Sequence, residues 1–401
     1  EANNKFYDAM PDIVADYMAK ISEITGRTYK PFNYYGAEDA ERVIVSMGSL
    51  SDVVYQAVNY LNGKGEKVGV INVHLYRPFS AKHLQAVLPK TVKKIAVIDR
   101  TKEPGAMGEP LYLDIVNFAK TVGLDVDIIG GRAGLGSKDV LPEDILPVFE
   151  ELQKDHPMHG FTIGIVDDVT NLSLPRADKM PLDTTGLTAC KFWGFGSDGT
   201  VGANKSAIKI IGDHTDLYAQ AYFAYDSKKS GGVTVSHLRF GTKPIDMPYL
   251  IDAADYIACH RQSYVKRFDL LRGIKDGGTF MLNCTWSDEE LDHQLPARIK
   301  RAIAKHHVKF YTLNGDAIGQ KLGLGTRINM VMQAAFFALA KVIPLDDAVK
   351  YLKDSIVKSY GKKGQKVVDM NWAAVDAGVG EFHEVNYPAS WADAVDEKVE
   401  G

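Results

Sequence analysis

Short apolar runs alternate with amphipathic helical patterns along this chain, and this alternation constrains the fold more than any other feature of the sequence. In the first half, helical patterns at residues 52–61, 81–87 and 109–121 separate apolar runs at residues 42–47, 67–73, 94–98 and 126–129. Strands that are apolar throughout, rather than at every second position, predict a parallel sheet with helices on both faces. The first half is therefore predicted to be a doubly wound α/β domain, which a helix over residues 142–155 completes.

The same alternation returns from residue 187 onward. The apolar runs are at residues 187–193, 217–225, 256–260, 278–284 and 308–313, and the helical patterns are at residues 202–214, 263–274, 296–306, 329–343 and 345–361. This second series predicts a second doubly wound α/β domain, followed by an extended tail.

The domain organisation follows from the length and from the breaks in these patterns. A chain of 401 residues predicts two or three domains at about 150 residues each. We expect a helix and connector from a preceding domain (1–41), a first domain (42–155), a linker (156–187), a second domain (188–380) and a tail leading to a further domain (381–401). Because the sequence begins at Glu1 without methionine, we expect it to be a piece of a longer polypeptide.

The composition narrows the function classes. Apolar residues make up 45% of the chain and charged residues 24%, which is typical of a globular protein. The net charge of −4 gives no reason to expect nucleic acid, and no apolar run approaches the length of a membrane span. The cysteines, Cys190, Cys259 and Cys284, are too far apart for a disulfide framework or a cluster motif, which predicts a reducing cytoplasm.

A glycine-rich segment, "GFGSDGTVGANK", lies between the predicted strand at 187–193 and the helix that follows it. Such a loop directs backbone N–H groups and a positive helix terminus at one point, which suits a phosphate. A tight turn with a purely structural role is the alternative. The candidate binding residues in this segment are Gly194, Gly196, Ser197, Asp198, Gly199, Thr200, Asn204 and Lys205.

Charged residues further along indicate which nucleotide the loop would bind. Asp226 has the spacing from the glycines that an NAD site requires, but Lys228 and Lys229 follow it and favour an additional phosphate. NADP and the 3′-phospho-ADP half of coenzyme A both carry one. Other polar residues at predicted strand ends or loops are expected to line the same crevice: Ser227, Arg239, Arg327 and Asn329.

Several catalytic motifs are missing from the sequence. No glycine precedes Lys205 directly, so the Walker pattern is absent and ATP hydrolysis is disfavoured. The segment "LNGDAIG" begins like a thiamine diphosphate motif, but no Asn pair follows it. We therefore assign no catalytic residue and no metal ligand.

Longer segments resemble a known family. "GFGSDGTVGANKSAIKIIG", "YFAYDSKKSGGVTVSHLRFG", "HRQSYV" and "GTRINMVMQAAFF" closely resemble the γ-type, Rossmann-like domain of the pyruvate:ferredoxin (flavodoxin) oxidoreductase family. "ERVIVSMGS", "VGVINVHLYRPFS" and "IAVIDRTKEPGAMGEPLYLD" resemble its transketolase C-terminal-like domain. The resemblance covers nearly the whole chain.

The resemblance implies a parent enzyme that oxidatively decarboxylates pyruvate on thiamine diphosphate, passes electrons through [4Fe-4S] clusters to ferredoxin or flavodoxin, and forms acetyl-coenzyme A. Its γ-type domain is associated with coenzyme A, which would place Gly196–Gly199 beside the diphosphate and Lys228 and Lys229 at the ribose phosphate. The implied partners are the other domains of the same polypeptide and a second copy of the parent enzyme. Without the cluster and thiamine motifs, this chain alone is predicted to be inactive. The alternatives are an NAD(P)-dependent oxidoreductase and a structural interdomain module.

Overall fold

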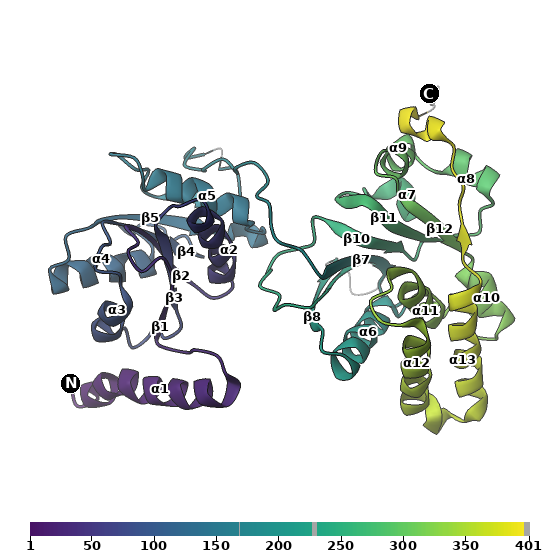
Figure 1. Cartoon of the computed structure of the whole chain (residues 1–401), viewed down its shortest axis with the longest axis horizontal. Coiled ribbons are helices and arrows are strands. Elements are labelled where there is room, and N and C mark those ends of the chain that lie inside the picture. Colours follow the sequence, from purple (N-terminus) through teal and green to yellow (C-terminus); the bar gives the residue numbers. More distant parts are fainter. Residues whose placement is uncertain (168, 227–230, 397–401) are drawn as a thin grey trace. The chain divides into compact units, whose positions relative to one another are not determined.

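A computed structural model describes residues 1–167, 169–226 and 231–396 of the chain. It divides into two compact units. The first comprises Glu1–Asp183 with Asp246–Tyr249, and the second comprises Thr184–Ile245 with Leu250–Gly401. Both units are α/β, as predicted from the sequence (Figure 1).

The first unit is built on a six-stranded sheet with the order β1-β3-β2-β4-β5-β6. Its strands are β1 (Phe32–Gly36), β2 (Arg42–Met47), β3 (Val68–Val73), β4 (Lys94–Asp99), β5 (Asp127–Ala133) and β6 (Phe161–Ile163). Its helices are α1 (Asn4–Thr25), α2 (Leu50–Gly63), α3 (Ala81–Val87), α4 (Pro110–Val122) and α5 (Pro142–Glu151). All neighbouring strands pair in parallel except β1, which is antiparallel to β3.

Both faces of this sheet are covered, which explains why its strands are apolar at every position. Ile44 and Ala96 pack beneath α2 and α5, while Val43 and Ile95, the residues just before them, pack beneath α3 and α4 on the opposite face (Figure 1). Successive side chains of a strand point to opposite faces, so both sets become core. The predicted ends of these strands differ from the observed ends by a few residues at most in β2, β3 and β4.

Two strands of the first unit lie where we expected none. The segment 25–39, expected to be a connector, contains β1, and the segment 156–187, expected to be a linker, contains β6. β1 is an edge strand whose side chains are partly exposed, and β6 has three residues. Neither gives the long apolar run that marks a buried strand.

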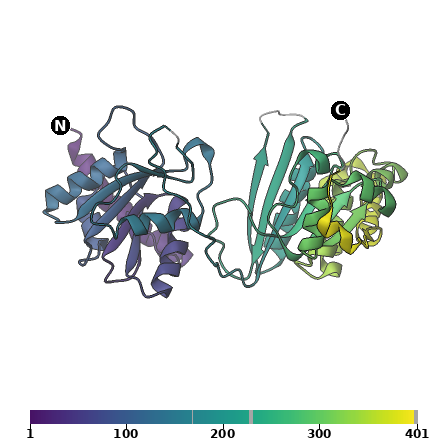
Figure 2. The same cartoon turned by 90° about the horizontal axis from the view of Figure 1, so that it is seen from above.

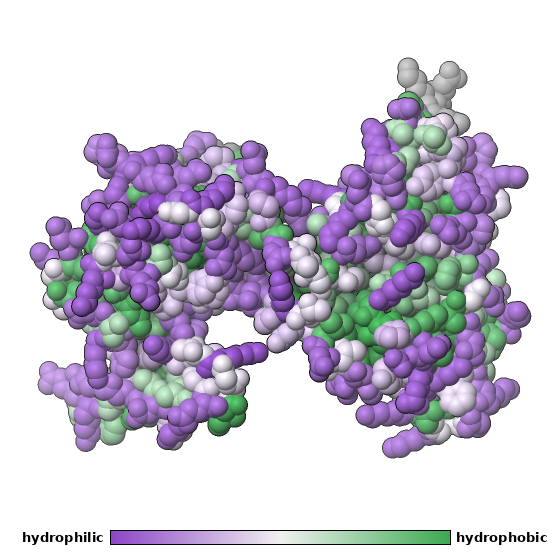
Figure 3. Space-filling model, in the orientation of Figure 1, coloured by the Kyte–Doolittle hydropathy of each residue, from purple (hydrophilic) through white to green (hydrophobic). Residues whose placement is uncertain are grey.

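Helix α1 is amphipathic as predicted, but its apolar stripe is exposed in this chain. Only Pro11 is buried among its residues. Hydrophobic side chains are visible on its surface in Figure 3, and the large exposed ones are Phe6, Tyr7, Met10, Ile13, Tyr17, Ile21 and Ile24.

The second unit has a seven-stranded sheet with the order β13-β12-β11-β10-β7-β9-β8. The strands are β7 (Leu187–Phe195), β8 (Tyr218–Tyr225), β9 (Val233–Gly241), β10 (Ala254–Cys259), β11 (Ile274–Asn283), β12 (Lys309–Leu313) and β13 (His383–Glu384). β7, β10, β11 and β12 are parallel. β9 is antiparallel to both of its neighbours, and β13 is antiparallel to β12. Figure 2 shows the long strands of this sheet side by side in teal.

Helices cover both faces of the second sheet. They are α6 (Thr200–His214), α7 (Tyr264–Arg267), α8 (Asp288–Gln294), α9 (Ala297–Lys305), α10 (Gly315–Lys321), α11 (Asn329–Ala340), α12 (Leu345–Tyr360) and α13 (Gln365–Gly380). α6 and α10–α13 enclose one core with the sheet, and α7–α9 enclose the other (Figure 1). Short 3₁₀ helices occur at Leu135–Ser137, Gly361–Lys363 and Ala389–Asp393.

Two elements of the second unit contradict the sequence-based assignment. β9 occupies a segment that we expected to be a loop, and α13 follows the last predicted helix (345–361), after which we expected only extended chain. β9 buries Ser236, His237 and Arg239, which interrupt its apolar pattern. Gly378 lets α13 approach α11, since a Cβ there would lie 2.3 Å from the carbonyl oxygen of Val331. A small residue at such a contact weakens the helical hydrophobic pattern that sequence analysis relies on.

None of the helices in the described part of the chain combines the length and apolar character that a membrane span requires. Within the same described residues, no group of three or more His, Cys, Asp or Glu side chains could hold a metal ion.

Candidate nucleotide site

The glycine-rich segment forms a tight loop between β7 and α6. β7 ends at Phe195 and α6 begins at Thr200. Ser197 and Gly199 both have positive φ, +79° and +88°. The carboxylate of Asp198 accepts hydrogen bonds from the backbone N–H groups of Phe195 and Thr200, each at 2.8 Å. Asp198, predicted to lie beside a diphosphate, therefore fixes the shape of the loop with its own carboxylate.

Each glycine of the motif lies where a side chain would collide with a neighbour. A Cβ at Gly194 would lie 2.7 Å from Cβ of Thr200, and one at Gly196 would lie 3.2 Å from the backbone nitrogen of Gly231. A Cβ at Gly199 would lie 3.2 Å from Cβ of Asn329, the first residue of α11. The glycines thus allow close packing, and the third one brings the predicted site residue Asn329 beside the loop.

The loop borders a cavity of about 550 Å³, which is within the usual range for small-molecule sites. Among the residues that the structure describes, four backbone N–H groups on this border have no hydrogen-bond acceptor: those of Ser197, Gly199, Val201 and Gly202. They lie at the N-terminus of the 15-residue helix α6, whose dipole adds positive potential. Unsatisfied amides at a helix N-terminus are the usual donors to a phosphate.

Thr234 lines the same cavity and supplies a second, independent sign of a ligand. It pairs with Gly194 across the β7–β9 ladder, and it is only 5% exposed. Its Oγ1 has no hydrogen-bond partner in the described part of the chain. A buried hydroxyl without a partner costs free energy, which a ligand oxygen or nitrogen in the cavity would recover.

The first turn of α6 is anchored to the sheet through a histidine. Oγ1 of Thr200 lies 2.7 Å from Nδ1 of His260, at the end of β10. Burial lowers the pKa of His260 to about 4, so its ring is neutral at neutral pH. Thr200 and Asn204, both predicted to donate to a ligand, are 1% and 3% exposed. They face the interior and do not line the cavity.

The other predicted site residues do not line the cavity or lie outside the described residues. Nζ of Lys205 lies 5.5 Å from the ring centroid of Phe223, on the β8 side of α6. Arg239 is within β9 rather than in a loop, about 17 Å along the strand from Thr234, and it donates to Gln220. Arg327 is exposed two residues before α11. Ser227, Lys228 and Lys229 lie outside the described residues, although Asp226, which precedes them, lines the cavity.

Sequence reasoning did not assign two residues that the structure brings to the cavity or against one of its lining residues. One is Thr234, and the other is Arg261, whose guanidinium lies 4.0 Å from the ring centroid of Phe195, a lining residue. Arg261 follows β10, so its place after an apolar run was a usable signal. Thr234 could be found only from the antiparallel pairing of β7 with β9.

The fold and the site together define an α/β protein with a strand–loop–helix site suited to an anion. Two family models match the chain: pyruvate ferredoxin/flavodoxin oxidoreductase over residues 189–381 and pyruvate:ferredoxin oxidoreductase core domain II over residues 40–145. The chain belongs to the pyruvate:ferredoxin (flavodoxin) oxidoreductase family, which confirms the resemblance seen in the sequence.

Curated relatives are similar over nearly the whole chain. It is 58% identical to the pyruvate-flavodoxin oxidoreductase of Enterobacter agglomerans over 100% of the chain and 34% of the relative. It is 60% identical to that of Klebsiella pneumoniae, over 98% of the chain and 34% of the relative. The pyruvate:ferredoxin oxidoreductase of Moorella thermoacetica is 58% identical over 99% of the chain and 34% of the relative. The chain thus spans about a third of the length of these relatives.

Proposed function

We propose that this chain supplies the coenzyme A-binding unit of an enzyme that oxidises pyruvate to acetyl-coenzyme A and reduces ferredoxin or flavodoxin. The observation that carries the proposal is the cavity beside the glycine loop, with its free amides and the unpartnered hydroxyl of Thr234. The free amides would hold the diphosphate of coenzyme A, and Lys228 and Lys229 would meet the 3′-phosphate. The guanidinium of Arg261, which lies over the ring of Phe195, adds positive charge near the loop.

The rest of the reaction is assigned to other parts of the longer enzyme. The cysteines of this chain are all buried in the hydrophobic cores, and the described residues contain no group suited to a metal. These residues do not fit an iron–sulfur cluster, and we derive no electron transfer through them. Thiamine diphosphate, the clusters, the homodimer and the cytoplasmic location stay predictions for the parent enzyme.

Calorimetric titration of the chain with coenzyme A, dephospho-coenzyme A and NADPH tests the proposal. We expect coenzyme A to bind more tightly than dephospho-coenzyme A, and the variant K228Q/K229Q to lose that difference while it still binds both. Gly212→Ala is a matched control, because a Cβ at this exposed α6 position meets nothing within 4 Å.

Three results of this titration would contradict the proposal in different ways. Equal affinity for coenzyme A and dephospho-coenzyme A would remove the role of the two lysines. Tighter binding of NADPH would favour the NAD(P)-dependent alternative, although the comparisons with known proteins do not favour it. If no ligand changes the melting temperature, the glycine loop is a structural turn; a ligand at a hundred times its dissociation constant should add about 2.7 kcal/mol.

A further inference from the structure

A second cavity lies within the first unit, at a place where the topology of the sheet favours binding. After β2 the chain crosses to β3 on one side, whereas β4, β5 and β6 extend the sheet on the other side. The strand order therefore reverses between β2 and β4, and ligands of open α/β sheets bind outside the carboxyl ends of the strands at such a point. Met47, at the end of β2, and Arg100, just after β4, line a cavity of about 330 Å³ there.

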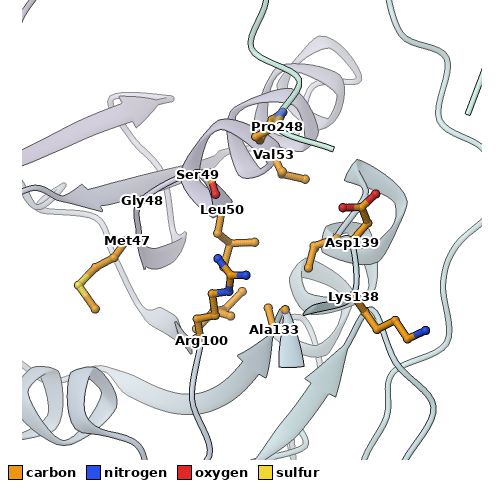
Figure 4. Close-up of a pocket in the computed structure, with 13 residues that line it drawn as sticks. Met47, Gly48, Ser49, Leu50, Val53, Arg100, Ala133, Lys138, Asp139 and Pro248 are labelled. Carbon is orange, nitrogen blue, oxygen red and sulfur yellow. The ribbon is translucent and has the colours of Figure 1, made fainter. Parts of the chain in front are cut away.

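The walls of this cavity are mainly apolar. Figure 4 shows side chains from β2, α2 and the segment after β5 around one space, among them Leu50 and Val53. Pro248 closes it from a later segment, Asp246–Tyr249, which belongs to the same unit. That segment is held by Gln56 of α2, which donates to the carbonyl oxygen of Asp246 and accepts from the hydroxyl of Tyr249 at 2.8 Å. The apolar wall is thus built from elements far apart in the sequence.

Arg100 supplies the main polar group of the cavity. Its side chain lies across Gly134, which has a φ of +67° and where a Cβ would come within 3.1 Å of Nε of Arg100. In Figure 4 its guanidinium points toward Ser49 and Leu50 at the start of α2. Among the described residues, Arg100 has no carboxylate partner.

Two other charged side chains border the cavity and affect which ligand charge it would prefer. Lys138 points away from the enclosed space in Figure 4. The carboxylate of Asp139 also lines it. In Figure 4 the guanidinium of Arg100 lies toward Leu50, on the apolar side of this space.

We propose that this cavity binds a small organic anion, in which a phosphate or carboxylate group meets Arg100 and an apolar body lies against the aliphatic walls. The site is separate from the glycine loop, which lies in the other unit. An unpaired guanidinium over an apolar pocket suits such a ligand, because the guanidinium offers several N–H donors in one plane and the pocket removes the apolar body from water.

Methionine-methyl NMR of the whole chain tests the site. The reporter is the methyl signal of Met47, which is assigned by its absence from the spectrum of the variant M47L. The probes are AMP, which has a phosphate group, and phenylpyruvate, which has a carboxylate group. Adenosine and inorganic phosphate, the two parts of AMP, are tested separately. We expect millimolar AMP or phenylpyruvate to shift the Met47 methyl signal, and the responding probe identifies the preferred anion. R100Q should weaken binding about tenfold, which corresponds to about 1.4 kcal/mol.

The matched control is K120Q, which removes a charge in the last turn of α4, outside the residues that line the cavity, and should change the affinity less than twofold. Saturation of the chain with coenzyme A should leave the titration unchanged, because the reporter lies in the other unit. The proposal is overturned if neither probe shifts the Met47 signal at millimolar concentration, or if R100Q binds as tightly as the parent chain. Equal shifts with adenosine would also overturn it, since they would show a purely apolar pocket.

Discussion

The two cavities of this chain each lie at the carboxyl end of a strand that is followed by a helix, but they offer positive charge in different ways. In the first unit the cavity is at the carboxyl ends of β2 and β4, and its charge is the side chain of Arg100. In the second unit the cavity is at the carboxyl end of β7, and its donors are the backbone amides of the glycine loop. Parallel strands followed by helices create the location in both units, and the local sequence decides which group faces a ligand.

This difference determines how each site responds to perturbation. A guanidinium can be removed by one substitution without a change in the backbone, whereas free amides remain in place as long as the loop keeps its shape. The second site therefore depends on the residues that hold the loop, chiefly Asp198 and the contact between Thr200 and His260. Substitutions at the second site should therefore change ligand affinity and the free energy of unfolding together, more closely than substitutions at the first site do.

The largest expected contrast between the units is in their response to acid. Burial lowers the pKa of His260 and of His237, both in the second unit, from 6.5 to about 4. Between these values the unfolded chain binds protons that the folded chain does not, so the free energy of unfolding falls as the pH falls from 6.5 to 4. The loss is at most roughly 3 kcal/mol for each histidine. In the first unit, burial raises the pKa of Asp99. The contribution of this carboxyl group to the free energy of unfolding therefore falls as the pH rises.

The tryptophans allow the second unit to be followed alone. All four of them, Trp193, Trp286, Trp372 and Trp391, belong to that unit. Denaturant unfolding followed by tryptophan fluorescence at pH 7 and pH 4.5 measures the effect, and hydrogen exchange in α4 reports the first unit. H260Q should reduce the pH dependence of the fluorescence transition. A transition with the same midpoint at both pH values would show that neither histidine is held neutral.

Substitution of Asp198 should have the next largest effect. Asp198→Ala leaves the N–H groups of Phe195 and Thr200 without their acceptor, which should lower the free energy of unfolding by about 2 kcal/mol. Because the loop would then have to be ordered on binding, the affinity for coenzyme A should fall about tenfold in calorimetry. Asp198→Asn, which keeps one acceptor oxygen and removes the charge, is the control. If Asp198→Ala binds more tightly, repulsion between the carboxylate and the ligand outweighs the shaping of the loop.

Thr234→Val separates binding from stability at the same site. The hydroxyl has no partner in the described chain, so its replacement by a methyl group should leave the free energy of unfolding unchanged or raise it by about 1 kcal/mol. If the hydroxyl meets the ligand, the dissociation constant for coenzyme A should rise several-fold. Thermal melts with and without ligand measure both quantities. A destabilised variant with unchanged affinity would show that Thr234 has a structural partner instead.

Burial and tertiary contacts explain which parts of the molecule could be predicted from the sequence. β2, β3 and β4 are buried on both faces, so their continuous apolar runs locate them closely. β9 is equally buried, but it contains His237 and Arg239, whose polar groups are satisfied by Ile251 and Gln220 from other segments. Such tertiary partners are not visible in a local pattern, and the strand was expected to be a loop.

The candidate site shows the same limit. The sequence located the glycine loop, because the strand, the turn and the helix are contiguous. It assigned Thr200 and Asn204 to the ligand on the basis of their side-chain chemistry, whereas the helix turns both toward the core. It omitted Thr234, which reaches the cavity only because β9 runs antiparallel beside β7. Residue type therefore pointed to the candidate loop, whereas strand pairing determines which residues line the cavity beside it.

Substitution of Lys205 should have the smallest effect on binding and stability. It tests whether a residue contributes to binding merely because it is close to the loop in the sequence. Its ammonium group lies over the ring of Phe223, at 5.5 Å from the centroid, rather than at the cavity. Lys205→Gln removes a charge from the exposed side of α6, so the affinity for coenzyme A should change less than twofold and the free energy of unfolding by less than about 1 kcal/mol. The salt dependence of coenzyme A binding, measured by calorimetry, should also stay the same. A loss of affinity comparable to that of Thr234→Val would mean that the ligand extends along the β8 side of α6, and the second cavity would then be defined by side-chain charge as the first one is.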